Sequence, residues 1–181
     1  MILKKKLKKL GLRSIFFILI VTISLSIYVL NSDMKLMNIS FQNNQPQYIV
    51  PFSLEDLNGN MRDISEWSDQ KILINFWATW CAPCRREMPM FQTLHLNQEK
   101  HGMQIIGIAV DQNELVRDFI NEYGISFPIL IGQSNAYEIM KDLGNTSLTL
   151  PYTLLVEPSG LITWYKNGEV TSQDLPMILG D

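Results

Sequence analysis

The residues best suited to chemistry are Cys81 and Cys84, the only two cysteines of the chain, which are separated by two residues. They follow an apolar run at residues 71–77, which is typical of a strand buried on both faces, and they begin a helix expected over residues 83–100. Backbone N–H groups at a helix N-terminus stabilise a thiolate over a thiol. We therefore expect Cys81 to attack a disulfide near neutral pH and Cys84 to resolve the mixed disulfide from within.

Pro83 lies between the two cysteines and stiffens the first helical turn at a position where a missing N–H does little harm. Two intervening residues in such a turn bring the sulfurs of Cys81 and Cys84 close enough to bond reversibly. A purely structural disulfide is one alternative, but so short a loop constrains the unfolded chain very little. The spacing therefore favours a redox disulfide.

A metal site is a second alternative for the cysteine pair. With His95 and His101, the cysteines have a spacing close to that of a zinc finger. However, a zinc finger places its first ligand pair on a β-hairpin, and a domain of this size does not need zinc to fold. We expect no metal and no cofactor, and surface or core roles for both histidines.

Strand and helix patterns alternate after the first 48 residues. A hairpin is expected over residues 52–64, with Asn58-Gly59 as its turn. The helix expected at 113–123 should bury Leu115, Phe119 and Ile120. The other expected elements are strands at 103–110, 127–131, 152–156 and 161–165, and helices at 135–143 and 171–179. A β-α-β half followed by a β-β-α half predicts an α/β domain with a central mixed sheet flanked by helices.

The N-terminal residues differ in character from this domain. Residues 1–13 carry six positive charges and no acid, and residues 14–30 are an uncharged apolar run at the short end of what spans a bilayer. The positive-inside rule predicts a single-pass anchor, with residues 1–13 in the cytoplasm and the rest on the extracytoplasmic (periplasmic) side. A signal peptide cleaved after Ser26 is the alternative. The amide-rich residues 31–48 are expected to tether a domain at 49–181.

Composition and charge exclude several classes of protein. With 181 residues, 46% of them apolar, the chain can bury a core without a disulfide scaffold. Six of the 15 basic residues lie before residue 14 and all 18 acidic residues lie after it, so the remainder has a net charge of −9. Nucleic-acid binding needs a basic face, and we therefore expect none.

Residues 75–89, NFWATWCAPCRREMP, closely resemble the active-site segment of thioredoxin-like proteins. More narrowly, they are similar to the TlpA/ResA-like branch of membrane-anchored, exported thiol–disulfide oxidoreductases. The resemblance runs from about Val50 to the C-terminus, and its further motifs follow in the same order at residues 57–59, 107–111, 127–128 and 150–160. It implies a thioredoxin-like fold with an N-terminal β-hairpin extension and an N-terminal membrane anchor.

The resemblance also implies a substrate-binding set beside the cysteines. Pro151 would be the cis-proline that faces the disulfide in this fold, although a proline can also simply begin a strand. The backbone of Leu150 would pair with an extended substrate chain. Trp80 is expected to cover the sulfurs and offer a docking surface, next to Pro83.

Glu87 is the third catalytic candidate, because it matches the acidic position of the ResA-like branch. It lies three residues after Cys84 on the same side of the helix. A carboxylate there could take the proton of the resolving thiol and would raise nearby thiol pKa values; a solvated helix glutamate is the alternative. Thioredoxin itself has a buried aspartate where this chain has Asn75, so that route to a general base is absent.

The resemblance implies a protein-disulfide reductase that is re-reduced by a membrane-embedded thiol donor. Apocytochrome c, whose haem-attachment cysteines must be reduced, is the expected substrate, and general reductive repair of exported proteins is the next. Ala82-Pro83 resembles the Gly-Pro of thioredoxin more than the Pro-His of strongly oxidising exported enzymes, which favours a reductant. A disulfide-forming oxidant, a thiol peroxidase and a non-catalytic binding module remain as alternatives.

Overall fold

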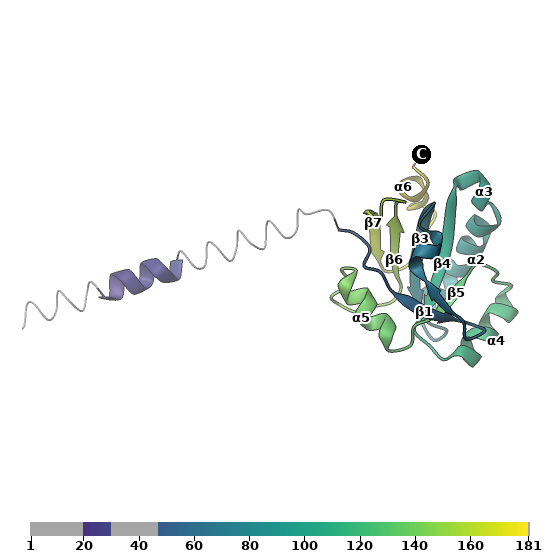
Figure 1. Cartoon of the computed structure of the whole chain (residues 1–181), viewed down its shortest axis with the longest axis horizontal. Coiled ribbons are helices and arrows are strands. Elements are labelled where there is room, and N and C mark those ends of the chain that lie inside the picture. The colour runs from purple at the N-terminus through teal and green to yellow at the C-terminus, as the bar shows by residue number, and fades with distance from the viewer. Residues whose placement is uncertain (1–19, 30–46, 181) are drawn as a thin grey trace, which may run out of the picture. The chain divides into compact units, whose positions relative to one another are not determined.

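The computed structural model describes residues 20–29 and 47–180 (Figure 1). The chain divides into two compact units, Met1–Gln45 and Pro46–Asp181. In the first unit, residues 20–29 form an exposed helix. Over the two described ranges, no helix is both long enough and apolar enough to cross a membrane. Residues 1–19 and 30–46, which include the whole predicted basic segment, both ends of the predicted anchor and most of the predicted tether, lie outside the described part.

The second unit is built on a seven-stranded sheet with the order β2-β1-β5-β4-β3-β6-β7. Strand β3 is parallel to β4 and antiparallel to β6, so the sheet is mixed, as predicted. Its strands are β1 (Ser53–Asp56), β2 (Met61–Asp63), β3 (Lys71–Trp77), β4 (Met103–Ala109), β5 (Ile129–Ile131), β6 (Tyr152–Val156) and β7 (Ile162–Asn167). Strand β4 and all but the first residue of β3 are buried, because helices cover both faces of the sheet.

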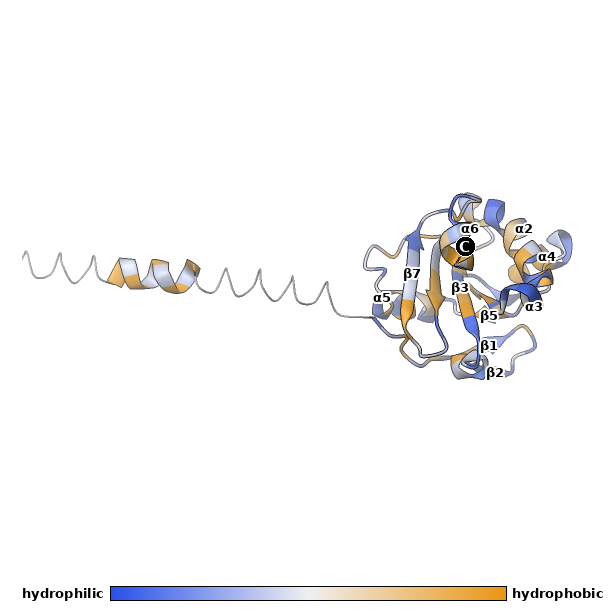
Figure 2. Cartoon of the chain, turned by 90° about the horizontal axis from the view of Figure 1, so that it is seen from above, coloured by the Kyte–Doolittle hydropathy of each residue, from blue (hydrophilic) through white to orange (hydrophobic). Residues whose placement is uncertain are grey.

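The helices α2 and α4 cover one face of the sheet and α5 covers the other (Figures 1 and 2). Two right-handed crossovers that advance in the same direction, β3-α2-β4 and β4-α4-β5, place their helices on the same face. The helices are α2 (Ala82–Leu96), α3 (Gln98–His101), α4 (Asn113–Tyr123), α5 (Asn135–Asp142) and α6 (Leu175–Leu179), with a 3-10 turn η1 (Ile64–Trp67).

Three helix predictions need correction. The helix expected over residues 83–100 ends at Leu96, and a separate short helix follows. The last helix covers only Leu175–Leu179, because residues 171–174 form a turn. Leu115, expected to be buried in α4, is 49% exposed. The buried residues of α4 are Val116 and Phe119, so Val116 takes the inward position that was predicted for Leu115.

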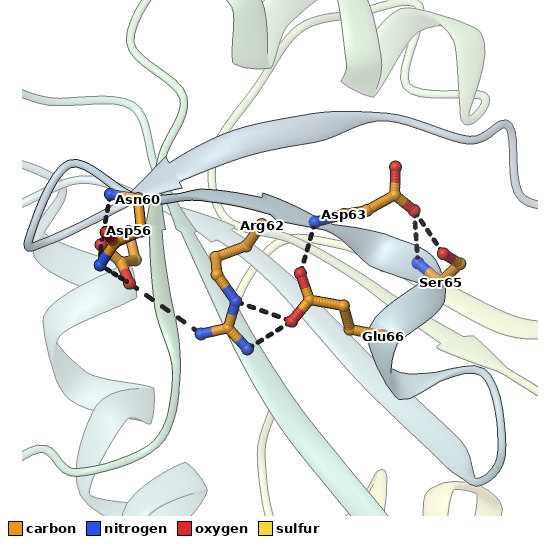
Figure 3. A network of polar contacts seen from close by, with 6 residues as sticks. All are labelled: Asp56, Asn60, Arg62, Asp63, Ser65 and Glu66. Atoms are coloured by element: carbon orange, nitrogen blue, oxygen red, sulfur yellow. Dashed lines mark hydrogen bonds and ion pairs between the residues drawn. The ribbon is translucent and has the colours of Figure 1, made fainter.

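Strands β1 and β2 pair antiparallel and extend the sheet beyond β5. Polar contacts hold this pair in place (Figure 3): the carboxylate of Glu66 receives hydrogen bonds from the Arg62 guanidinium and from the Asp63 backbone. The Asp63 side chain accepts from the backbone N–H of Ser65 at 2.9 Å, which completes a capping box at η1. Such reciprocal bonds satisfy N–H groups that a helix start leaves unpaired.

Gly107 in β4 allows neighbouring side chains of the core to pack against its backbone. A Cβ at this position would lie 2.6 Å from Cδ1 of Ile129 and 3.0 Å from Nε1 of Trp77. Gly107→Ala is therefore expected to lower the free energy of unfolding by about 1–3 kcal/mol through overpacking, measured by urea denaturation. Adding Ile129→Val removes the nearest atom and should recover part of the loss; full stability of the single variant would contradict this packing argument.

Candidate active site

Cys81 and Cys84 form a disulfide at the N-terminus of α2, with an S–S distance of 2.02 Å. Cys81 is the N-cap residue, and its sulfur accepts a hydrogen bond from the backbone N–H of Cys84 at 3.3 Å. Pro83 occupies the first turn. Cys81 is 6% exposed, whereas Cys84 is completely buried. A helix N–H directed at the Cys81 sulfur favours its thiolate after reduction, so Cys81 is the better placed of the two to attack.

The loop between β3 and α2 is fastened to the end of the neighbouring strand. The backbone N–H of Thr79 donates to Oδ2 of Asp111 at 3.1 Å, and the Thr79 hydroxyl donates to the same oxygen. The next residue, Trp80, is 64% exposed. An exposed indole on a fastened loop directly before Cys81 offers a large apolar contact surface beside the disulfide.

Leu150 and Pro151 lie at the same end of the sheet as the disulfide, joined by a cis peptide bond. They directly precede β6, whose first residue, Tyr152, pairs with Phe76 near the end of β3. Within the described part of the chain, the backbone N–H and C=O of Leu150 form no hydrogen bond. The backbone of Leu150 is therefore available to an extended chain.

The loop before Leu150 is organised by Asn145, a residue that sequence reasoning missed. Asn145 is completely buried; its Nδ2 donates to the backbone carbonyl of Thr149 at 2.9 Å, and its Oδ1 accepts from the hydroxyl of Ser147 at 2.8 Å. Because both the NH2 group and the oxygen of its amide form hydrogen bonds with the loop, this side chain fixes the course of the loop. An asparagine in a polar loop carries no sequence signal that separates it from an exposed one.

Glu87 is buried inside the domain, not solvated on its helix, with an exposed fraction of 1%. Its Oε1 accepts from Nδ2 of Asn75 at 2.8 Å, and its Oε2 accepts from the backbone N–H of Val170 at 2.7 Å. Loss of solvent raises the pKa of Glu87 to about 8, although both hydrogen bonds and the charge of Lys166 act in the opposite direction. A carboxyl group that titrates near neutral pH is suited to both giving and taking a proton.

Asn75 is a positioning residue for Glu87. It is completely buried in β3, and its Nδ2 donates to Thr153 Oγ1 at 3.0 Å as well as to Glu87. The amide thus connects β3 with α2 and β6. In the sequence, Asn75 stood out only because an aspartate is absent there; the unused signal was a single polar residue inside the otherwise apolar run 72–77.

Charged side chains around this buried carboxyl are paired with one another. The guanidinium of Arg86 donates to both carboxylate oxygens of Glu169, and Lys166 Nζ lies 2.6 Å from Oδ2 of Asp174. The two histidines considered as metal ligands lie on different helices, His95 on α2 and His101 at the end of α3. Across residues 20–29 and 47–180, no three His, Cys, Asp or Glu side chains lie together as a metal site would require.

Comparison with solved structures gives the fold. A thiol:disulfide interchange protein of the thioredoxin family from Chlorobium tepidum superimposes with a TM-score of 0.66 at 22% identity, covering 75% of this chain and 95% of its own. StoA from Bacillus subtilis superimposes with a TM-score of 0.59 at 27% identity, covering 75% of this chain and 100% of its own. The predicted thioredoxin-like fold is confirmed.

A thioredoxin-like domain with a C-x-x-C pair at the start of the helix after its central strand defines a thiol–disulfide oxidoreductase. The AhpC/TSA family matches residues 47–165. The thiol-disulfide oxidoreductase ResA of Halalkalibacterium halodurans is 36% identical over 129 residues, 68% of this chain and 69% of the relative. ResA of Oceanobacillus iheyensis is 29% identical over 181 residues, 98% of this chain and 91% of the relative. The chain belongs to the AhpC/TSA family and is a thiol–disulfide oxidoreductase of the ResA type.

Proposed function

We propose that this oxidoreductase reduces disulfides of exported proteins through a Cys81–Cys84 dithiol/disulfide cycle. The Cys81 thiolate attacks one sulfur of the substrate disulfide, which forms a mixed disulfide and releases the first substrate thiolate. The Cys84 thiolate then attacks the Cys81 sulfur and releases the second. Two electrons pass to the substrate, and the enzyme is left with the Cys81–Cys84 disulfide. The hydrogen bond from the helix N-terminus to the Cys81 sulfur carries this assignment of roles.

Glu87 serves the second step of this cycle in the proposal. Cys84 and Glu87 are three residues apart on α2, and both are buried, so their side chains are neighbours on one helix face. The resolving thiol must lose its proton before it attacks, and the carboxylate of Glu87 accepts it. The raised pKa of Glu87 suits this role, since it leaves the group able to return the proton in the reverse reaction.

The substrate is proposed to bind as an extended chain along Leu150 and Pro151, with Trp80 and Pro83 on the other side of the disulfide. The backbone groups of Leu150, which have no hydrogen-bond partner among the described residues, support this arrangement, because strand addition gives affinity through main-chain hydrogen bonds without demanding one sequence. The large exposed surface of Trp80 supports it as well.

The proposed location is the outer side of the cytoplasmic membrane. Residues 14–30 would form the single-pass anchor, residues 1–13 would stay in the cytoplasm, and residues 31–48 would tether the catalytic domain. There, a membrane-embedded thiol donor would re-reduce the enzyme disulfide. Apocytochrome c is the favoured substrate, because its haem-attachment cysteines must be thiols before haem is ligated. The ResA relatives support the type of enzyme, and the apolar run at residues 14–30 supports the anchor.

The test is the reduction potential of the full chain, equilibrated with glutathione or dithiothreitol buffers, followed by reduction of an oxidised apocytochrome c peptide. A potential near that of thioredoxin, about −270 mV, or moderately above it, together with reduction of the peptide, is the expected result. A potential near −120 mV, about that of the strong periplasmic oxidant, would replace the reductant proposal by a disulfide-forming one. Peroxide consumption without a protein substrate would favour a peroxidase.

Trp80→Ala is expected to raise the KM for an oxidised protein substrate about 5- to 10-fold, the effect of losing a central aromatic contact. Met61→Ala is the matched control, because Met61 is 61% exposed on β2 at the far edge of the sheet. Steady-state kinetics with both variants measure the difference. Equal KM values for the two variants would remove Trp80 from the docking surface.

A further inference from the structure

Leu148 combines two unfavourable features on the loop that leads to Leu150. Its φ is +54°, in the left-handed region, and its apolar side chain is 39% exposed. A leucine in this conformation costs roughly 1–2 kcal/mol relative to the right-handed one. Such outliers persist only where the surrounding structure imposes them, and they concentrate at functional sites.

The surrounding structure imposes this conformation through the buried amide of Asn145. Hydrogen bonds lie on both sides of Leu148: its own N–H donates to the Asn145 carbonyl at 3.3 Å, and the Thr149 carbonyl accepts from Asn145 Nδ2 at 2.9 Å. The hydroxyls of Ser147 and Thr149 lie 3.1 Å apart on the same turn. Because Asn145 is completely buried, the turn that carries Leu148 is held from inside the domain.

The turn places Leu148 close to the backbone of Leu150, where the substrate chain is proposed to bind. Leu148 is two residues before Leu150, whose backbone groups are unpaired within the described part of the chain. Residues 144–150 carry no charge, and Trp80 adds an exposed apolar surface at the same end of the sheet. A chain that pairs with Leu150 would pass directly along Leu148, and an apolar side chain on it would bury both surfaces from water.

We propose that Leu148 is a specificity-determining residue that selects disulfide substrates with an apolar side chain within two residues of the cysteine attacked by Cys81. Asn145 is its positioning residue, since it holds the left-handed turn. This inference rests on the proposed function, because it assumes that a substrate chain pairs with Leu150. Selection would come from the burial of apolar surface. Leu148 would therefore disfavour substrates with polar side chains next to the cysteine, without forming a hydrogen bond to the substrate.

The experiment uses two peptides that each contain one intramolecular disulfide and differ only in flanking residues, leucine in one and serine in the other. The pre-reduced full chain is mixed with each peptide, and kcat/KM for peptide reduction is measured. Wild type is expected to prefer the leucine peptide by about 10-fold, the lower end of the discrimination that apolar contacts supply. Leu148→Asn should bring the ratio close to one, because asparagine tolerates the left-handed region but lacks the apolar side chain.

Two further variants separate specificity from general damage. Leu96→Asn changes a leucine that is 71% exposed at the last residue of α2, the end opposite to the disulfide, and should keep the 10-fold preference. Asn145→Ala should raise the KM for the leucine peptide more than it lowers kcat, with the reduction potential unchanged, since the sulfurs and α2 are untouched. A purely structural effect of Asn145 would instead lower the activity toward both peptides equally.

The outcomes separate this inference from the proposed function. Equal reduction of both peptides by wild type, or a preserved preference in Leu148→Asn, would overturn the role of Leu148 and leave the reductase proposal standing. If wild type reduces neither peptide while it retains a titratable disulfide, the proposed function fails, and the inference fails with it.

Discussion

Replacing Cys81 by serine is expected to abolish disulfide reduction, with a loss on the order of 10³-fold or more in turnover. Serine has almost the same size, but its hydroxyl does not ionise near neutral pH. The N-cap position of α2 therefore no longer carries a thiolate that can attack the substrate disulfide. Cys84→Ser should also lose turnover, but in a different way. It retains the Cys81 thiolate and should accumulate a mixed disulfide with the substrate, because nothing resolves it.

Non-reducing electrophoresis and mass spectrometry after mixing with an oxidised protein measure this difference. The trapped adduct should form with Cys84→Ser and not with Cys81→Ser. Trapping by both variants would show that Cys84 attacks as readily as Cys81, contrary to its complete burial. If the variant with both serines still supported function, the protein would act as a binding module and not as a redox enzyme.

Glu87→Gln is expected to change how stability depends on pH. The pKa of Glu87 is raised from 4.5 to about 8 in the folded protein, so between these values the folded state binds a proton that the unfolded state has lost. The stability that this proton provides is complete below about pH 4.5 and is lost as the pH rises through about 8. For wild type, unfolding free energy should therefore fall across this window, by a total on the order of a few kcal/mol.

Glutamine is neutral at every pH, so the unfolding free energy of Glu87→Gln should not show this fall. Urea denaturation at intervals between pH 4 and pH 9 measures both curves. Glu138→Gln is the control, because Glu138 is exposed on α5, and its curve should follow that of wild type. Parallel curves for wild type and Glu87→Gln would mean that folding does not raise the pKa of Glu87.

The general fold and the position of the redox pair were predictable because they depend on local patterns. The apolar run at 71–77 is long enough to mark a buried strand, and Pro83 at the beginning of the next periodic segment marks a helix start. The boundaries of α2 and α6 were wrong, since helix ends depend on tertiary contacts as much as on the residues that form them. The inward face of α4 was misplaced because Leu115 and Val116 are both apolar, and only packing decides between them.

The polar interior of the site could not be predicted in the same way. Whether Glu87 is solvated or buried depends on the Asn75 amide and the Val170 backbone, 12 and 83 residues away in sequence. Interactions between residues so distant in sequence leave no periodic signal, and they emerge only when the sheet is assembled.

The backbone hydrogen bond from Val170 to Glu87 makes the segment between β7 and α6 a natural spectroscopic reporter. This amide proton faces a negative oxygen when Glu87 is ionised and a neutral one when it is protonated. Its chemical shift and its rate of exchange with deuterated solvent should therefore follow the proton occupancy of a group 83 residues away. One backbone signal would thus report the ionisation of Glu87 in both the oxidised and the reduced protein, without a label on either sulfur.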